Sequence, residues 1–389
     1  MKIIPFPDNK RFAFTFTDDT DDATTSSVST VYDFLDEIGI KATKTVWVFP
    51  NKRKSGNPEA FGKKCKGDTL QNPEYLKLIK DLERRGHEIS LHLATGGNNL
   101  RDETIKAYEF FKNTFGHYPK VNINHGRNAD NLYWCREAFQ KGIFRVLAGL
   151  YSKDRSEGHI PNSPYFWGDI CKKHTKYIRL FKTLHLNTLA ANPSMPFHDP
   201  AKKYVARWFT NTDLSTSWLI NKLLTIKNIE RLIEKNGACI GYAYLHQFVE
   251  RDREIDMTFL QHMTLLKQYS NSCWFTPVSS LLDRLEQIQK LKISESKREY
   301  RIINTCSAPI TDIWITGNPN ESIILENGYH KTFGASGVIH IESIPAEQNT
   351  KTTSTPQLKP YEMVRLVLNQ ILLLVIHHAN GRAIKRSGW

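Results

Sequence analysis

The chain has 389 residues, of which 40% are hydrophobic, 24% charged and 11% aromatic. These proportions lie in the range of folded globular proteins and exclude a globally disordered chain. The length allows one α/β barrel of about 250 residues together with an appendage. The formal net charge of +13 attracts polyanions through a long-range field. The basic residues are dispersed, however, so we predict no specific nucleic-acid partner.

The densest basic clusters lie in one polar stretch, at residues 52–54 and 63–66, without regularly interleaved aromatic residues. We interpret this stretch as a solvated loop, with an anion-contacting loop as the alternative.

The cysteines and the first residues bear on the cellular compartment. The six cysteines are scattered without a C-x-x-C pair, which predicts reduced thiols rather than a zinc knuckle or a disulfide framework. The first residues include no long apolar stretch and no small-residue cleavage site. We therefore expect a cytoplasmic protein without a secretory signal.

From residue 11 to about residue 285, short β-like runs alternate with longer helical patterns, as when crossover helices join parallel strands. The expected strands are residues 11–17, 43–49, 88–93, 120–124, 144–148, 177–183, 238–245 and 273–276. The expected helices are residues 29–38, 73–85, 102–115, 131–141, 219–235, 257–269 and 278–291. This order predicts a distorted (β/α)7–8 barrel over residues 1–292.

The composition changes near Ile293, where alternating runs separated by turn residues begin. Runs at residues 301–305, 312–316, 322–325 and 337–341 predict a small all-β domain over residues 293–376. The apolar stretch at 363–376 is interrupted by polar residues and is shorter than the ~20 residues that span a bilayer. It predicts a closing strand or a buried helix and no transmembrane segment. Residues 377–389 form a basic tail, which we expect to be frayed.

Acidic and imidazole side chains follow four of the expected strands. The first strand runs into four carboxylates within five residues, Asp18, Asp19, Asp21 and Asp22, and three later strands are followed by His92, His125 and His246. Reactive groups of a (β/α) barrel project from the carboxyl ends of its strands, so these groups are expected to converge. A cation bound by carboxylate and imidazole can polarise a carbonyl and activate a water. A second carboxylate can then act as base, and a distal imidazole can protonate a leaving amine.

Each of these features also has a structural interpretation. The acidic cluster could cap the following helix, because Asp is a favoured N-cap residue. A histidine at a strand end is often part of a structural hydrogen bond, and His-Gly-Arg-Asn at residues 125–128 also resembles a turn. The occurrence of such groups at four separated strand ends favours a site.

These motifs resemble the polysaccharide deacetylase family with the NodB homology domain, over roughly residues 12–285. The family's T-F-D-D motif is similar to Thr-Phe-Thr-Asp-Asp at residues 15–19, with one extra residue before the acids. Its G-x-x-A-T, G-H-E-I-x-x-H and late L-H motifs are similar to residues 39–43, 86–92 and 245–246. The resemblance implies a distorted (β/α) barrel, Asp18 as general base and Asp19 as metal ligand. It also implies His92 as the first metal histidine and His246 as the catalytic acid.

The chain departs from the family pattern at two points. The family's second metal histidine falls four residues after the first, where this chain has Gly96. The third motif, R-x-P-Y or similar, aligns loosely with residues 122–128 without its Pro and Tyr. We therefore hypothesise that His125 replaces the missing imidazole, so that Asp19, His92 and His125 hold a divalent metal, with zinc the expected ion. His185 is a weaker substitute, because its setting between two leucines also fits a half-buried strand.

The expected function is a metal-dependent hydrolase that removes an acetyl group from an N-acetylated sugar or glycan precursor, its carbohydrate partner. The first alternative is a catalytically inactive barrel that binds carbohydrate. The second is a glycoside hydrolase, which needs two carboxyl groups ~5–5.5 or ~6.5–9.5 Å apart around the sugar bond. Adjacent acids on one loop do not readily provide that arrangement.

Overall fold

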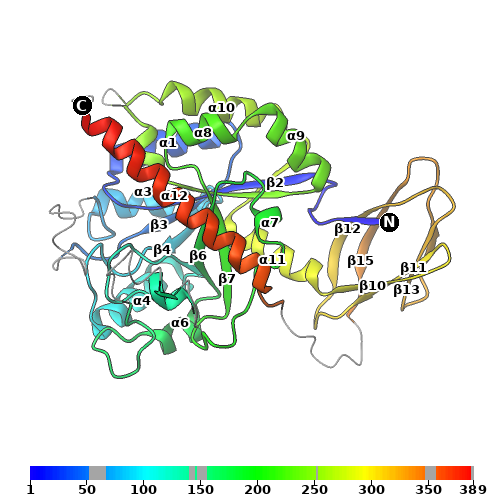
Figure 1. Cartoon of the computed structure of the whole chain (residues 1–389), viewed down its shortest axis with the longest axis horizontal. Coiled ribbons are helices and arrows are strands. Elements are labelled where there is room, and N and C mark those ends of the chain that lie inside the picture. The colour runs from blue at the N-terminus through cyan, green and yellow to red at the C-terminus, as the bar shows by residue number, and fades with distance from the viewer. Residues whose placement is uncertain (52–66, 140–144, 147–155, 251–252, 347–355, 387–389) are drawn as a thin grey trace.

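The structure, a computed structural model, describes residues 1–51, 67–139, 145–146, 156–250, 253–346 and 356–386 (Figure 1). A ring of parallel strands forms the barrel, and β2 closes it by pairing with both β8 and β3. In chain order the strands are β2 (Phe12–Asp18), β3 (Thr43–Val46), β4 (Glu88–Leu91), β5 (Val121–Asn122), β6 (Tyr177–Thr183), β7 (Arg207–Asp213) and β8 (Ala238–Ala243). A further strand, β9 (Cys273–Phe275), pairs with the first residues of β2, on the edge whose last residues pair with β3. The predicted (β/α) barrel is thereby confirmed, with seven strands in its ring.

Helices on the outside of the barrel bury one apolar face against the strands. Helix α1 (Thr25–Glu37) begins where Thr24 caps the backbone of Ser27, and it buries Val28, Val31 and Leu35 at helical spacing. The other helices are α3 (Pro73–Arg84), α4 (Arg101–Phe115), α6 (Gly168–His174), α7 (Thr188–Ala191), α8 (Ser217–Leu223), α9 (Ile226–Lys235), α10 (Met257–Lys267) and α11 (Val278–Gln289). Short 3-10 turns occur at η1 (Cys135–Ala138) and η2 (Leu245–Phe248).

Several predicted elements differ from the observed ones. Strand β7 was not predicted, because its polar residues Thr210, Asn211 and Thr212 conceal the strand pattern, although all three are buried. The predicted helix at 219–235 is two helices, since Thr225 caps a new one. The predicted helix at 131–141 contains only η1 within its described part. The predicted strand at 144–148 lies outside the described residues except for residues 145–146, which are helical, and both basic clusters lie outside them entirely.

Helix α11 closes the amino end of the barrel. The backbone N–H of Val278 donates to Thr43 Oγ1 at 2.9 Å, and that of Ser279 donates to Glu88 Oε2 at 3.1 Å. Asp283 Oδ1 accepts from Lys176 Nζ at 2.6 Å. These partners lie at or just before the first residues of β3, β4 and β6, so α11 covers the amino end of the barrel. A site can therefore be open only at the carboxyl end of the strands.

The small β domain follows α11 directly and lies beyond the amino end of the barrel (Figure 1). One sheet has the order β1-β12-β15 and the other β10-β11-β13-β14, and their buried faces share a core that includes Ile302, Ile313 and Ile341. The strands are β1 (Lys2–Ile4), β10 (Leu291–Ser296), β11 (Glu299–Asn304), β12 (Ile310–Thr316), β13 (Ser322–Leu325), β14 (His330–Thr332) and β15 (Val338–Ile344). Residues 2–4, which the sequence placed with the barrel, thus belong to a sheet of this domain.

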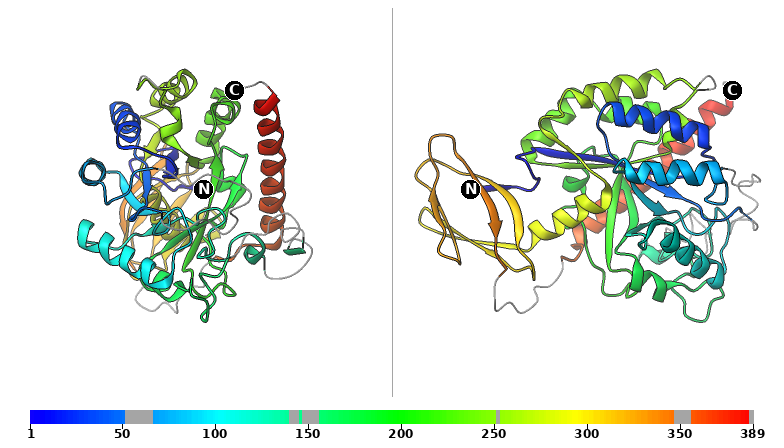
Figure 2. Two further views of the ribbon diagram at one scale, coloured as in Figure 1. Left: turned by 90° about the vertical axis from the view of Figure 1, so that its left-hand side faces the viewer. Right: turned by 180° about the vertical axis from the view of Figure 1, so that it is seen from behind.

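The last described helix, α12 (Pro360–Arg386), returns from the β domain and runs along the barrel beside β6 (Figures 1 and 2). It buries Leu366, Val367 and Leu373, while Leu368 and Leu372 on its other side are exposed. The stretch predicted to be a closing strand or buried helix is therefore helical. The helix also continues through most of the predicted frayed tail. Among the described residues, no helix combines the length and hydrophobicity needed to cross a bilayer.

Candidate metal and hydrolytic site

The strand ends of the barrel bring together acidic and imidazole groups from three places in the sequence. Strand β2 ends at Asp18 and leads into the loop that carries Asp21, while His92 directly follows β4. His125 follows the short strand β5. Because all these strands are parallel, their carboxyl ends meet at one rim, as expected for the reactive groups of such a barrel.

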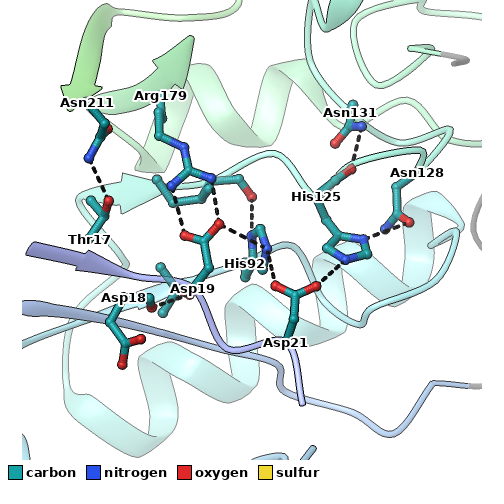
Figure 3. Close-up of polar contacts among 12 residues, drawn as sticks. Thr17, Asp18, Asp19, Asp21, His92, His125, Asn128, Asn131, Arg179 and Asn211 are labelled. Atoms are coloured by element: carbon teal, nitrogen blue, oxygen red, sulfur yellow. Dashed lines mark hydrogen bonds and ion pairs between the residues drawn. The ribbon is translucent and has the colours of Figure 1, made fainter. Parts of the chain in front are cut away.

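Asp21, His92 and His125 form one compact group (Figure 3). Asp21 Oδ2 lies 3.1 Å from His92 Nε2, and Asp21 Oδ1 lies 2.6 Å from His125 Nε2. The three ligand atoms lie within 4.8 Å of one another. Ligand atoms about 2.0–2.2 Å from a tetrahedral zinc ion would lie roughly 3–3.5 Å apart. The donor types fit a divalent metal, and the 2.6 Å contact between Asp21 and His125 would have to widen to reach this spacing.

Hydrogen bonds fix the orientation of both imidazoles. His92 Nδ1 donates to the Ile123 carbonyl at 3.0 Å, and His125 Nδ1 donates to Asn128 Oδ1 at 3.1 Å. In the neutral rings Nε2 then presents a lone pair toward Asp21. Two such lone pairs facing a carboxylate repel it unless a proton or a cation lies between them. Partners that hold Nδ1 in this way are typical of metal-binding histidines.

The loop around Gly96, where the family pattern has its second histidine, helps to position His125 through Asn128. Asn128 Nδ2 donates to the Gly97 carbonyl at 2.6 Å, which fixes the amide so that its oxygen faces His125 Nδ1. The carbonyl of Gly97 also accepts from Asn99 Nδ2 at 2.9 Å. The segment around Gly96 therefore holds the position of an imidazole that comes from the next strand end.

Electrostatic effects favour a charged carboxylate at Asp21. Burial alone would raise the pKa of Asp21, but His125 and His92, when protonated, outweigh this effect through their charge and hydrogen bonds and hold the pKa well below its usual range. The aromatic ring of Trp47 lies parallel to His92 and edge-on to His125, with ring centroids 6.3 Å and 5.7 Å away. An apolar wall beside charged ligands lowers the local dielectric and strengthens their attraction for a cation.

Asp19, which the sequence predicted as a metal ligand, is held by an arginine. Arg179 donates to its two carboxylate oxygens at 2.8 Å and 2.6 Å (Figure 3). Its Oδ2 lies 3.7 Å from His92 Nε2, so the carboxylate lies beside the metal group. Among the described residues, the carboxylate grouped with the two histidines is Asp21. Asp21, two residues after the predicted ligand Asp19, thus lies between the two histidines.

Asp18, which the sequence predicted as the general base, lies in a buried ion pair. Its Oδ2 is 2.9 Å from Lys44 Nζ and accepts from Tyr32 at 3.1 Å, while Oδ1 accepts from the backbone of Leu245 at 2.8 Å. Asp18 and Lys44 are fully buried. Burial alone would lower the pKa of Lys44, but Asp18 raises it above its usual value. Asp18 therefore has the environment of a structural ion pair.

The two remaining predicted histidines lie outside the metal group. His246 lies in η2, and its Nδ1 is buried without a hydrogen-bond partner among the described residues. Burial lowers the pKa of His246, against the opposing charges of Asp18 and Asp21. His185 is exposed in the loop after β6, where its backbone carbonyl accepts from Thr212.

Sequence reasoning overlooked two cations on β6, Arg179 and Lys182. The strand reads Tyr-Ile-Arg-Leu-Phe-Lys-Thr and was identified from its apolar residues. A charged side chain in a strand that is buried along most of its length needs a partner or a function. That signal was available in the sequence. The sequence alone does not distinguish Asp21 from its neighbours, because four acids within five residues can be aligned with the family's two-acid motif in several ways.

Comparison with known proteins gives solved structures with low similarity. No protein-family model and no curated protein sequence matches the chain. Puue allantoinase aligns over 73% of this chain and 93% of its own, with 10% identity and a TM-score of 0.41. Peptidoglycan deacetylase PdaC from Bacillus subtilis aligns over 73% and 95%, with 12% identity and a TM-score of 0.33. A family 4 acetyl xylan esterase from Clostridium thermocellum, solved with cobalt, aligns over 70% and 90%, with 13% identity and a TM-score of 0.32.

Proposed function

We propose that this protein is a metal-dependent hydrolase that removes an acetyl group from an N-acetylated sugar. The observation that carries the proposal is the group of Asp21, His92 and His125, in which both imidazoles turn Nε2 toward one carboxylate. Their Nδ1 atoms are held by fixed acceptors, so the orientation does not depend on the substrate.

The proposed ligand set is Asp21, His92 and His125, in place of the set with Asp19 that the sequence suggested. When bound there, a divalent cation such as zinc would polarise the acyl carbonyl and lower the pKa of a water to about 7. His125 supplies the imidazole that the family pattern places at Gly96. Asn128 and the Ile123 carbonyl keep the two rings in place, which reduces the reorganisation needed on binding.

Asp19 is the proposed general base. Its two oxygens accept from Arg179, and each keeps a further lone pair that can accept a proton. The bidentate contact fixes the plane of the carboxylate, and Oδ2 lies next to His92. A base held in this way takes a proton from the attacking water without first losing side-chain freedom. Asp18 has no such role in this proposal, because it is fully buried and Lys44, Tyr32 and the Leu245 backbone occupy both of its oxygens.

His246 is the proposed acid that protonates the leaving amine. A departing amine cannot leave as an anion at neutral pH, so a proton donor is needed on the side away from the base. Burial lowers the pKa of His246, while the charges of Asp18 and Asp21 act in the opposite direction and favour the protonated ring that a general acid needs. The charge of Asp21 acts on this ring, which indicates that His246 lies within electrostatic reach of the metal group.

The choice of an acetylated sugar rests on the motif resemblance at residues 15–19 and 86–92. The geometry supports hydrolysis of an acyl bond more generally. A panel of N-acetylated and O-acetylated sugars, with a simple acetyl ester and an amide for comparison, would identify the substrate class.

The deciding experiment combines metal content with acetate release. The wild-type chain and the variants Asp21→Asn, His125→Ala and Asp19→Asn are loaded with zinc, dialysed and tested on the panel. The control is His185→Ala, which removes an exposed histidine outside the group. We expect wild type and His185→Ala to retain about one zinc per chain, and Asp21→Asn and His125→Ala to lose it. Asp19→Asn should retain zinc but release acetate about 10²–10⁴-fold more slowly.

The possible outcomes separate the alternatives. Full zinc retention by His125→Ala would exclude the proposed ligand set. Zinc loss in Asp19→Asn with retention in Asp21→Asn would restore the ligand predicted from the sequence. Zinc binding without acetate release would indicate another hydrolytic reaction, and the absence of both would favour an inactive barrel that binds carbohydrate.

A further inference from the structure

Lys182 and Arg179 point to the same side of β6 although they are three residues apart. Alternation along a regular strand would place such residues on opposite faces. The pairing of β6 with β7 shifts its register between Arg179 and Phe181, which is a β-bulge. Both cations lie over the ring of Tyr242, with Arg179 Cζ at 4.7 Å and Lys182 Nζ at 3.2 Å from its centroid. The bulge therefore directs a second cation toward the proposed site.

The two cations differ in their partners. Arg179 is neutralised by the bidentate contact with Asp19. Within the described part of the chain, Lys182 Nζ makes no hydrogen bond or ion pair, and its observed contact is the Tyr242 ring. Its side chain is partly exposed. An ammonium has three donors, so Lys182 keeps donors that a ligand could use.

A divalent ion bound at Asp21 would leave a positive excess near Lys182. Burial lowers the pKa of Lys182 to about 8, so it remains protonated at neutral pH, and the charges that act on it are those of Asp213, Arg179, Asp19 and Asp21. Asp19 and Arg179 cancel each other, and Asp213 Oδ1 accepts from the backbone and hydroxyl of Ser215. With a divalent ion beside Asp21, the cations would exceed the carboxylates. Such a region attracts an anionic group on a ligand.

Helix α12 holds the backbone of Lys182. Gln370 Oε1 accepts from the Lys182 N–H at 3.1 Å. Strand β5 ends at Asn122, whose register partner on β6 is Ile178, so its ladder does not reach Lys182. The side chain of Gln370 thus accepts the hydrogen bond that a longer β5 would otherwise accept from the Lys182 N–H. The position of Lys182 is set by the fold and differs from that of a mobile surface lysine.

We propose that Lys182 is a specificity-determining residue that binds an anionic group, such as a carboxylate, on the substrate. The substrate class is then an acidic acetylated sugar rather than a neutral one. This inference rests on the proposed function in one respect, because it assumes that the substrate occupies the same rim as Asp21, His92 and His125.

A binding experiment tests the inference without turnover. D-glucuronate and D-glucose, which differ by one carboxylate, are titrated calorimetrically into zinc-loaded full-length protein at pH 6.5. The variants are Lys182→Met, which keeps the length of the side chain without its charge, Lys182→Arg, which keeps a cation, and Lys172→Met, which changes an exposed lysine on α6. We expect glucuronate to bind wild type and Lys172→Met alike and to bind Lys182→Met about tenfold or more weakly. Lys182→Arg should retain most of the affinity.

Equal affinity of glucuronate for wild type and Lys182→Met would overturn the inference, as would glucose binding as tightly as glucuronate. No binding of glucuronate to wild type would overturn it too. Unchanged far-UV circular dichroism and thermal midpoint in Lys182→Met would show that a loss of affinity does not come from misfolding.

Turnover then separates this inference from the proposed function. Zinc-loaded protein is compared on N-acetylglucosamine and its 6-carboxylate, N-acetylglucosaminuronic acid. We expect Lys182→Met to raise KM for the acidic sugar while leaving kcat/KM for the neutral sugar within about twofold. Acetate release with no effect of Lys182→Met would refute the inference alone. Glucuronate binding through Lys182 without acetate release from either sugar would refute the proposed function alone.

Discussion

Replacement of Asp18 tests whether this residue supports the fold or the chemistry. Asp18→Asn removes a charge that faces Lys44 at 2.9 Å in the interior, while the Tyr32 and Leu245 donors remain. An uncompensated buried ammonium costs about 3–5 kcal/mol when its partner is removed. We therefore expect Asp18→Asn to lower the free energy of unfolding by that amount.

The assay is urea unfolding followed by circular dichroism at pH 7, with the variants Asp18→Asn, Lys44→Met and the double variant. Each single change leaves one polar group without its partner, whereas the double change removes both charges. The double variant should therefore lose less stability than the sum of the two single losses, with a coupling of about 0.5–3 kcal/mol. Zinc content measured on the folded fraction should remain near that of wild type.

The opposite pattern would refute this reasoning. If Asp18→Asn unfolded at the wild-type urea concentration and bound zinc but released no acetate, Asp18 would be the general base that the family resemblance implied. Additive losses in the double variant would show that Asp18 and Lys44 do not stabilise each other.

Three further predictions concern the support of the site and the joint between the domains. Asn128→Ala should weaken zinc binding about 10–100-fold, because Asn128 holds Nδ1 of His125, and titration against a chelator would measure this; unchanged affinity would contradict the role. Burial raises the pKa of Asp130 to about 7, against donors from Asn99, and the unfolded value is about 3.9. The folded state therefore binds the proton more tightly, so this contribution to stability is fully present below about pH 4 and is lost as the pH rises through 7. Urea unfolding should show a smaller fall in stability from pH 5 to 8 in Asp130→Asn than in wild type, and parallel curves would refute the assignment. Arg284 donates to the carbonyls of Pro5, Thr311 and Asp312 at 2.6–2.7 Å, so Arg284→Ala should separate the melting of the β domain from that of the barrel in calorimetry; a single unshifted transition would count against this joint.

The sequence was sufficient for the barrel because the hydrophobic patterns of most strands and helices are local. It failed at β7, where polar residues such as Asn211 face a buried interior and bind neighbours such as Thr17. Periodicity cannot distinguish such a strand from a loop, since its polar groups are satisfied by partners distant in sequence.

The site was predictable as a set of residue types and strand ends, but the roles of individual acids were not. His92 and His125 do lie together, whereas the choice among the acids depends on where Lys44 and Arg179 reach. Those cations come from β3 and β6, and their positions follow from the closed barrel and from the bulge in β6. No motif in the loop at residues 18–22 contains that information.

The first strand, β1, belongs to the β domain, and the last helix, α12, packs against the barrel. This arrangement affects the timing of folding during synthesis. Gln370 is 188 residues downstream of Lys182, and Thr316, which donates to the Lys2 carbonyl, is 314 residues downstream of its partner. At translation rates of about 5–20 residues per second, the backbone of Lys182 waits roughly 10–40 s for α12. A nascent barrel would thus bring Asp21, His92 and His125 together well before β6 acquires its final support. Competence for substrate would then be a late event in biosynthesis, reached after the small β domain has been made.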